Sequence, residues 1–529
     1  MNRTTRFLAP ASLAINACCP KVHLQTIPHR HVNITAKAAQ SSTKTHLKAC
    51  PKKSYMDNLN CKSGDERSDI SSMNEEDISC AFRKMHVAPI LDEKVESLDF
   101  NLNADTKTSR ISGPVDKKKY KKIRIWKSVS QEEAIGNQEQ PFEFRILSFN
   151  ILAQDLLDTH SYLYAGHNKS QLSWEKRKPL IVQEILESEA HVICLQEVQE
   201  NHLKDFLVPF QNHKFNYLYK RRTNDKTDGL LLMYREDIFT LMESLKVELF
   251  QNGIELLSRD NVGLIAKFSL KKNPETQFVV ATTHLLYNPR RNDVRLGQVQ
   301  LLFAEIERLS FIENTPLGPQ YLPIILSGDF NLLPHSGVYK FITEGSIEFM
   351  GKGRNLEECD YRCLTNSLIP PHLYVTDECQ HFNVLSRRLS GKGSGRVMLR
   401  NTECEDDSQT GERSQLQADA GLVDSKTTVY QKVEVADGHY VTFSSGLLTH
   451  PFQLRSVYNH QDKNGRIEAT TFQDRWITVD YMFYSNMQVL EKYQLPSVED
   501  CTKLISRIPN SVVGSDHFCI GATFRLDNR

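Results

Sequence analysis

The stretch Ile324-Ile325-Leu326-Ser327-Gly328-Asp329-Phe330-Asn331 runs from apolar residues into a glycine, an acid and an amide. A short apolar run bounded by turn-forming residues indicates a buried strand, whose two-residue period directs Asp329 and Asn331 the same way. A carboxylate can orient or deprotonate a water, and an amide can donate hydrogen bonds to phosphoryl oxygens without repelling them. Gly-Asp-x-Asn is also typical of a plain turn after a strand, so the other strand ends decide between the two interpretations.

The same change from an apolar run to a polar side chain recurs along the chain. The polar residues at these further junctions are Asn150, Glu197, His284, Asp480, Asp516 and His517. Apolar residues at helical spacing in 179–190 and 292–312 predict helices between some of the strands, and Pro179 suits a first helical turn. Strands that alternate with helices predict an α/β fold.

A single acid or histidine beside a strand is most often structural. Six junctions with one kind of chemistry are harder to explain in that way. Oxygen ligands with few carboxylates suit Mg²⁺, which keeps several waters and shares its coordination sphere with a substrate phosphate. Zinc would require more histidine or cysteine, and the chain has no CxxC pair. The pattern therefore favours Mg²⁺-dependent phosphoester chemistry.

The bulk composition excludes several classes. The 529 residues carry 65 basic and 65 acidic side chains, so no global positive charge attracts nucleic acid, and any such attraction must be local. No apolar run approaches the ~20 residues of a membrane span, which predicts a protein with no membrane contact. The twelve cysteines are scattered, which favours a reduced, intracellular protein of the cytoplasm or nucleus.

The first 140 residues are predicted to be largely disordered. Residues 1–56 contain nine Lys or Arg and no acid, which is the composition of a mitochondrial transit peptide and equally of a disordered basic tail. Residues 57–99 are acidic and poor in apolar side chains, so burial cannot offset the entropy of the chain.

A basic arm follows at residues 117–126, with Tyr120 and Trp126 among lysines. One interpretation is an RNA-binding arm, whose aromatic rings stack on bases while the lysines contact phosphates. The alternative is a solvated arm that docks on the domain through Ile123, Ile125 and Trp126. The catalytic domain itself is predicted to span 142–529, with a flexible insertion at about 380–437 where Gly, Ser, Arg and acids dominate.

Ordered motifs along the chain resemble those of the endonuclease/exonuclease/phosphatase superfamily. They are Leu195-Gln196-Glu197, Thr283-His284, Gly328-Asp329-Phe330-Asn331, Val479-Asp480-Tyr481 and Ser515-Asp516-His517. Three finer motifs resemble the Ccr4/nocturnin-type branch: Ser148-Phe149-Asn150-Ile151-Leu152, Asp480-Tyr481-Met482-Phe483-Tyr484-Ser485 and Ile508-Pro509-Asn510. Within that branch the chain most resembles the Angel protein family. The resemblance covers residues 142–529 outside the insertion.

The resemblance implies a four-layer α/β sandwich, in which two mixed sheets pack face to face between helices and the site lies at one rim. It also implies roles for eight residues. Glu197 would ligate Mg²⁺, with Asn150 and Asp516 supporting the waters of the metal. Asp329 would position or deprotonate the attacking water, and Asn331 and His284 would hold phosphoryl oxygens. Asp480 would orient His517, whose imidazolium would offset charge on the phosphoryl group.

The Angel branch implies a phosphatase that removes a 2′,3′-cyclic phosphate from an RNA 3′ end and leaves a free diol. The wider Ccr4 branch implies the alternative, a 3′-to-5′ poly(A) exoribonuclease. Leu332 after the Asp329 motif, and residues 471–476 before Asp480, depart from the poly(A) enzymes, which argues against adenine selectivity. A non-catalytic RNA-binding protein is disfavoured because every catalytic position is filled. No leucine-rich repeat is present for docking on a deadenylase complex.

Overall fold

The computed structural model describes residues 115–129, 141–390, 402–403, 430–436 and 438–527. All of them belong to one unit of the chain, Lys84–Arg529. The predicted targeting segment and acidic stretch, and the remainder of 1–114, lie outside the described residues. Within the described part of the chain, no helix is both long and apolar enough to cross a membrane.

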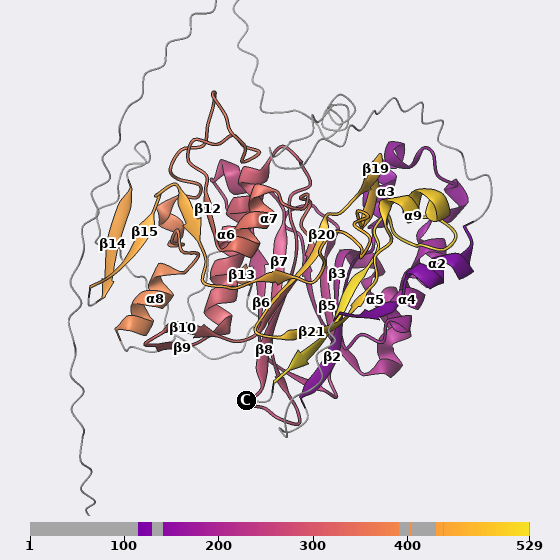
Figure 1. Cartoon of the computed structure of the whole chain (residues 1–529), viewed down its shortest axis with the longest axis horizontal. Coiled ribbons are helices and arrows are strands. Elements are labelled where there is room, and N and C mark those ends of the chain that lie inside the picture. Colours follow the sequence, from indigo (N-terminus) through magenta and orange to yellow (C-terminus); the bar gives the residue numbers. More distant parts are fainter. Residues whose placement is uncertain (1–114, 130–140, 391–401, 404–429, 437, 528–529) are drawn as a thin grey trace, which may run out of the picture. The chain divides into compact units, whose positions relative to one another are not determined.

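Two seven-stranded sheets occupy the middle of this unit (Figure 1). The first has the order β1 (Trp126–Ser128), β21 (Gln488–Tyr493), β22 (Ile520–Leu526), β2 (Phe142–Asn150), β3 (Val192–Gln199), β5 (Asp228–Arg235) and β4 (Phe215–Arg221). The second has the order β13 (Thr402–Glu403), β6 (Phe239–Glu248), β7 (Val262–Leu270), β8 (Gln277–His284), β11 (Ile324–Asp329), β20 (Asp480–Ser485) and β17 (Arg455–Ser456). Each sheet contains a parallel pair, β2 with β3 and β8 with β11, among antiparallel neighbours. Both sheets are therefore mixed.

Helices cover the outer faces of the sheets. They are α2 (Lys117–Ile123), α3 (Gln154–Thr159), α4 (Trp174–Glu187), α5 (Leu203–Leu207), α6 (Asn292–Ser310), α7 (Gly337–Glu344), α8 (Phe382–Leu389) and α9 (Val498–Asp500). Four two-stranded ribbons lie outside the two large sheets: β9 (Phe311–Thr315) with β10 (Gly318–Tyr321), β12 (Ser346–Glu348) with β16 (Leu447–Thr449), β14 (Gln431–Ala436) with β15 (His439–Phe443), and β18 (Thr471–Gln473) with β19 (Arg475–Ile477).

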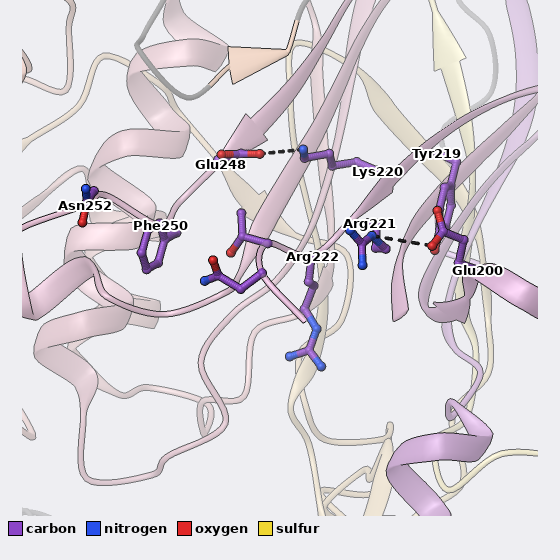
Figure 2. Close-up of a pocket in the computed structure, with 10 residues that line it drawn as sticks. Glu200, Tyr219, Lys220, Arg221, Arg222, Glu248, Phe250 and Asn252 are labelled. Carbon is purple, nitrogen blue, oxygen red and sulfur yellow. Dashed lines mark hydrogen bonds and ion pairs between the residues drawn. The ribbon is translucent and has the colours of Figure 1, made fainter. Parts of the chain in front are cut away.

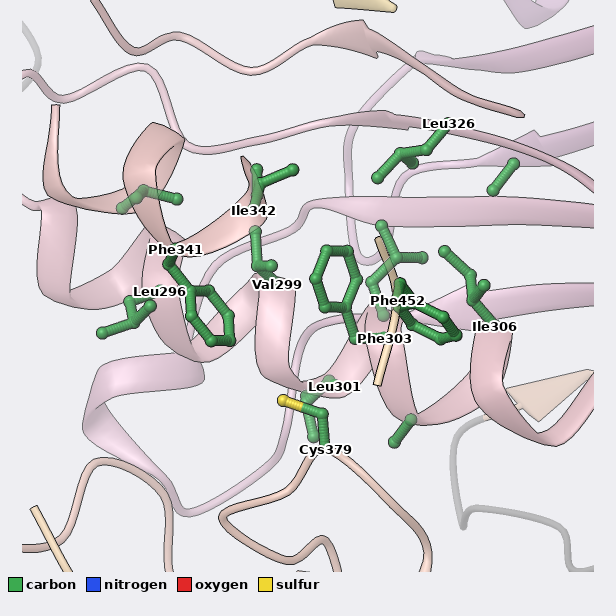
Figure 3. Close-up of a cluster of buried hydrophobic side chains, with 14 of the residues drawn as sticks. Leu296, Val299, Leu301, Phe303, Ile306, Leu326, Phe341, Ile342, Cys379 and Phe452 are labelled. Atoms are coloured by element: carbon green, nitrogen blue, oxygen red, sulfur yellow. The ribbon is translucent and has the colours of Figure 1, made fainter. Parts of the chain in front are cut away.

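Three hydrophobic clusters separate the layers. The cluster between the sheets includes Phe144 of β2 and Phe278 of β8, whose ring centroids are 5.0 Å apart. A second cluster lies between the first sheet and α4, and the third lies between the second sheet and α6. In the third, Phe303 of α6 lies beside Phe341 of α7 and Phe452 (Figure 3). This order of layers confirms the predicted four-layer α/β sandwich.

The helix predicted at 179–190 begins earlier than expected. It is α4, which starts at Trp174 and contains Pro179 in its interior. The apolar pattern alone placed the proline at the first turn, because Pro is favoured there. The extra turn matters because it carries Arg177, which is fully buried below the site.

The basic arm docks on the domain, as in the second interpretation, but Ile125, one of the three residues expected to make the contact, is 47% exposed. Strand β1 pairs with β21, and Tyr120 of α2 is buried with its hydroxyl 3.2 Å from Glu184 of α4. The guanidinium of Arg124 donates to the carbonyls of Gln494 and Cys519. The aromatic rings of the arm are therefore used for packing, while its lysines remain exposed.

The predicted insertion at about 380–437 begins with residues that pack on α6. His381 lies 3.1 Å from buried Glu305, and Arg388 of α8 lies 2.7 Å from Glu307. Helix α6 is buried almost all round, so its acids need such partners. The rest of the range holds β13 and β14, while 391–401, 404–429 and 437 lie outside the described residues.

Candidate active site

The polar strand ends of the second sheet line up side by side. His284 is the last residue of β8 and Asp329 the last of β11, and they are partners in the parallel register. Asp480 is the first residue of antiparallel β20 and is opposite Asp329. Because carboxyl ends of parallel strands meet at one edge of a sheet, the three side chains lie along one rim.

The close pairing of β8 and β11 requires glycine just before Asp329. Gly328 has φ +146°, and a Cβ atom added there would lie 2.0 Å from the carbonyl oxygen of Thr283. A side chain at this position would push the two strands apart. The glycine of the Gly-Asp-x-Asn motif therefore sets the spacing between Asp329 and His284.

The first sheet supplies Asn150 at the end of β2 and Glu197 on β3. The amide nitrogen of Asn150 donates to Glu197 at 2.9 Å and to Asp329, in the opposite sheet, at 3.1 Å. The amide oxygen of Asn150 accepts the backbone N–H of Leu152. Asn150 therefore holds one carboxylate from each sheet.

Glu197 lies at an irregularity in its strand. The β3 and β5 register shifts between Leu195 and Val198, and Glu197 has φ +57°. This left-handed backbone is unfavourable for a glutamate and is maintained by its surroundings. The second carboxylate oxygen of Glu197 accepts the backbone N–H of Ala153 at 3.0 Å. The bulge thus aims Glu197 toward the rim with two donors in place.

His517 lies beneath the carboxylates of the second sheet. Its Nδ1 is 2.9 Å from Asp480, and its Nε2 is 3.8 Å from Asp329 and 3.9 Å from Asp516. Burial lowers the pKa of His517, but Asp480 and the other two carboxylates more than offset this and raise the pKa well above its usual value. Asp480 therefore orients the His517 ring, and the raised pKa favours its protonated form.

His284 and Asp329 have pKa values shifted in opposite directions from their usual ones. Burial lowers the pKa of His284, whose Nε2 is 3.6 Å from Asp329. Burial, and then the charge of Asp480, raise the pKa of Asp329. A neutral imidazole beside a carboxylate of increased basicity suits transfer of a proton from water. Nδ1 of His284 is buried and has no hydrogen-bond partner.

Asn331 is placed by its turn rather than by strand geometry. Strand β11 ends at Asp329, and Asn331 has φ +51°, so the two-residue period stops before it. Its backbone N–H donates to Asp329 and its side-chain amide donates to the carbonyl of Leu285, both at 3.0 Å. One of its two amide hydrogens remains for another acceptor.

All eight predicted residues are linked by these contacts, and two further residues were not predicted from the sequence. The hydroxyl of Tyr164 donates to Asp516 at 2.7 Å. Arg177 donates to the carbonyls of Ile151, Leu152 and Gly514, which flank Asn150 and Asp516 in the chain. Neither residue lies at a strand end, which was the signal that identified the others.

The carboxylates of the site are suited to a divalent cation. Burial, and then Asp516 and Asp228, raise the pKa of Glu197 to about 7. Several buried acids close together are an environment in which an oxygen-ligated cation is stabilising. Asp329, Asp480 and His517 also bring ligand atoms within 4.8 Å of one another. Glu197 and Asp516, whose charges interact, are a second pair of carboxylates that could hold a cation.

Comparison with known proteins agrees with this geometry. The family model of the Endonuclease/Exonuclease/phosphatase family matches residues 147–517. Protein angel homolog 2 of Danio rerio is 32% identical over 421 residues, a match that spans 74% of this chain and 66% of that protein. Protein angel homolog 2 of Homo sapiens is 31% identical over 439 residues, 77% of this chain and 73% of that protein.

Protein angel homolog 1 of Homo sapiens is 33% identical over 459 residues, 76% of this chain and 67% of that protein. The crystal structure of ANGEL2, a 2′,3′-cyclic phosphatase, in complex with adenosine-2′,3′-vanadate has a TM-score of 0.59 and 32% identity. That match covers 76% of this chain and 98% of the other. Similar identities to both homologues do not distinguish between them.

The chain belongs to the Endonuclease/Exonuclease/phosphatase family, and within it to the Angel proteins. It is therefore a hydrolase of phosphoric esters. The six cysteines that the structure describes are free thiols.

Proposed function

We propose that this protein removes 2′,3′-cyclic phosphate from RNA 3′ ends in a reaction that depends on Mg²⁺ and leaves a 2′,3′-diol. The observation that carries the proposal is the similarity to ANGEL2, a 2′,3′-cyclic phosphatase, over 98% of that solved chain. The rim described above supplies the necessary groups: a base, an imidazolium, and carboxylates for a cation.

The first hydrolysis opens the cyclic diester. One water adds to phosphorus, one P–O bond to the ribose breaks, and a 2′- or 3′-monoester results. A second water then releases inorganic phosphate and the diol. In both steps Asp329 takes a proton from the water, because burial and Asp480 raise the pKa of its carboxyl.

The remaining residues hold the reacting phosphoryl group. His284 and the free amide hydrogen of Asn331 donate to its oxygens, and the imidazolium of His517 offsets charge that develops on it. Mg²⁺ would be held by Glu197 and Asp516, where it would act as a Lewis acid toward the phosphoryl oxygens. Asn150 fixes Glu197 for this role, and Tyr164 fixes Asp516.

The test is an assay of purified protein on one synthetic RNA with four different 3′ ends: cyclic phosphate, 2′-phosphate, 3′-phosphate and hydroxyl. We expect the first three to become diols in Mg²⁺, whatever the last base. An RNA that ends in hydroxyl poly(A) should be shortened far more slowly. Rapid shortening of poly(A) with the cyclic end untouched would replace this proposal with the exoribonuclease alternative.

We place the activity inside the cell and propose that residues 1–56 decide its compartment. Their basic, acid-free composition suits a mitochondrial transit peptide. Fusion of these residues to a fluorescent protein tests the idea. Import into mitochondria supports it, and a diffuse signal in the cytoplasm and nucleus contradicts it.

A further inference from the structure

A polar groove lies on the same rim as the active site. In the first sheet, β4 is two strands from β3, which carries Glu197. In the second sheet, β6 is two strands from β8, which ends in His284. The adjoining ends of β4 and β6, Arg221 and Glu248, both line the groove. The groove is therefore a lateral continuation of the site, toward the β4 and β6 side of both sheets.

Two contacts hold the lining of the groove in place, and one of them joins the two sheets. Lys220 of β4 and Glu248 of β6 form an ion pair of 2.7 Å across it (Figure 2). The turn after β4 is fixed to the chain before β7, because the hydroxyl of Thr223 donates to Asp260 at 2.7 Å. These contacts make the groove part of the folded domain rather than a gap beside a loop.

The volume of the groove, about 680 Å³, lies in the range of ligand-binding sites. Its lining combines cations, an aromatic ring and amides: Arg221, Arg222, Phe250, Asn224 and Asn252 contribute to it. Cations that meet phosphates, and rings that stack on bases, are the two requirements of a site for single-stranded nucleic acid.

The two arginines differ in how firmly they are paired. Arg222 is bound to buried Asp228, so its position is fixed and only part of its guanidinium is free. Arg221 has a side chain that is 43% exposed, a longer contact of 3.6 Å with its only acidic partner among the described residues, Glu200, and a hydrogen bond of 3.0 Å to the carbonyl of Lys226. Figure 2 shows Arg221 and Glu200 facing each other at the groove wall. Arg221 is therefore the cation best able to exchange its partner for a phosphate.

The charge of one groove residue also acts on a residue of the proposed catalytic site. Burial lowers the pKa of His284, and the charge of Arg222 adds to that lowering. The charge of Arg222, on the groove wall, is therefore felt at the His284 imidazole.

We propose that this groove binds the single-stranded RNA immediately 5′ of the reacting terminus, with Arg221 on a phosphate and Phe250 against a base. The inference rests on the proposed function, which puts the 3′ end at Glu197, Asp329 and His284. The chain of a longer RNA must leave that point, and the groove offers space, charge and a stacking surface directly beside it. A phosphate contact and a stacking contact do not read base edges, so binding through Arg221 and Phe250 should depend little on sequence.

The experiment compares Arg221→Glu with Lys214→Glu. Lys214 precedes the opposite end of the same strand, is 66% exposed and also has one long ion pair, 3.8 Å from Asp237. Each variant is assayed on a 12-residue RNA with a 2′,3′-cyclic end and on a nucleoside 2′,3′-cyclic phosphate. We expect Arg221→Glu to lower the ratio of kcat/KM for the long substrate to that for the short one about tenfold. Lys214→Glu should leave that ratio unchanged.

Binding gives a second readout that does not depend on turnover. Fluorescence anisotropy with a 12-residue RNA ending in hydroxyl should show weaker binding by Arg221→Gln. The slope of log affinity against log salt should fall by about 0.7, because the variant neutralises one phosphate fewer. Phe250→Ala should weaken binding without changing the slope, because a stacking interaction releases no counterion.

Three results would contradict the proposal that the groove binds single-stranded RNA. They are equal effects of Arg221→Glu and Lys214→Glu, equal losses on long and short substrates, or binding of duplex RNA as tightly as of single strands. If no cyclic end is hydrolysed at all, the proposed function fails. The anisotropy of the Arg221 and Lys214 variants then judges the groove separately.

Discussion

The carboxylate of Glu197 accepts hydrogen bonds from Asn150 and Ala153 and still has lone pairs directed at the rim. Its position depends on a left-handed backbone that the β3 bulge imposes. A near-isosteric amide would keep the shape of this side chain and remove its charge. This substitution therefore tests the contribution of the Glu197 charge to activity separately from any effect on folding.

Glu197→Gln is expected to lower kcat by at least about 10²-fold, since the charge that we propose holds the metal is lost. The melting temperature should stay within a few degrees of the wild type, because no cavity opens. Glu143→Gln, at the exposed far end of β2, is the matched control and should retain full activity. A Glu197→Gln variant that turns over at the wild-type rate would remove Glu197 from the site.

The pKa of Glu197 predicts how Mg²⁺ affects thermal stability. In the folded protein it is raised to about 7 from a usual value of 4.5, so the folded state holds this proton more tightly than the unfolded state. Stability is therefore lost as pH rises from about 4.5 to about 7, and a bound cation offsets the loss where the group is ionised. Differential scanning fluorimetry should show a larger Mg²⁺-induced rise in Tm at pH 8 than at pH 6.

Glu197→Gln provides the control for this pH effect. The variant should show a smaller rise in Tm with Mg²⁺, and the difference between pH 8 and pH 6 should shrink. Asp329, whose pKa is raised in the same direction, accounts for any part that remains. Equal rises at both pH values in the wild type would contradict the metal assignment.

At the scale of elements, α4 fixes the loops that carry the site. Arg177 is fully buried on this helix, and its guanidinium donates to carbonyls in the loop after Asn150 and in the loop before Asp516. A helix on the outer face of the first sheet thereby sets the separation of two segments that are far apart in sequence. The geometry of the candidate site is thus determined partly by a fully buried residue behind it.

Arg177→Met should destabilise the fold by about 3–5 kcal/mol, because several buried carbonyls lose their donor. Equilibrium urea unfolding measures this loss. Lys178→Met, the neighbouring residue, loses only a surface ion pair with Asp205 and should cost less than about 1 kcal/mol. Similar losses in the two variants would show that the Arg177 hydrogen bonds contribute little.

Sequence patterns predicted the polar residues at the strand ends, but they did not predict the tertiary contacts that hold those residues in place. Apolar runs that stop at Asn150, Glu197, His284 and Asp329 are local signals, and the parallel pairs β2/β3 and β8/β11 bring their ends to one rim. The turn that places Asn331 has a left-handed backbone, so strand periodicity misses it. Tyr164 and Arg177 act through tertiary contacts that no local pattern encodes.

At the scale of the whole chain, parts of the predicted insertion at about 380–437 pack on the domain, while 391–401, 404–429 and 437 lie outside the described residues. Helix α8 covers the acids of α6, and β13 pairs with β6. Composition predicted one flexible insertion over this range. Composition cannot show which parts of this range pack on the domain. Arg388 has the polar character of its neighbours, and only its tertiary contact with Glu307 distinguishes it.

Replacement of residues 404–429 by a short Gly/Ser linker should leave Tm and turnover of a nucleoside 2′,3′-cyclic phosphate nearly unchanged. Loop length changes closure entropy only logarithmically, and both described flanks are kept. Replacement of the whole range 380–437 should lower Tm by several degrees, since Glu305 and Glu307 lose buried partners. Equal Tm values for the two replacements would show that α8 does not stabilise the domain.

The two hydrogen bonds of Asn150 join Glu197 of one sheet to Asp329 of the other. A relative slide of the sheets by about 1 Å would break one of them while leaving every strand and helix intact. Substitutions among the phenylalanines between the sheets, such as Phe144 and Phe278, should therefore reduce turnover at temperatures well below unfolding. Activity should then be lost at a lower temperature than the fold. That temperature is the one at which the two sheets cease to be aligned.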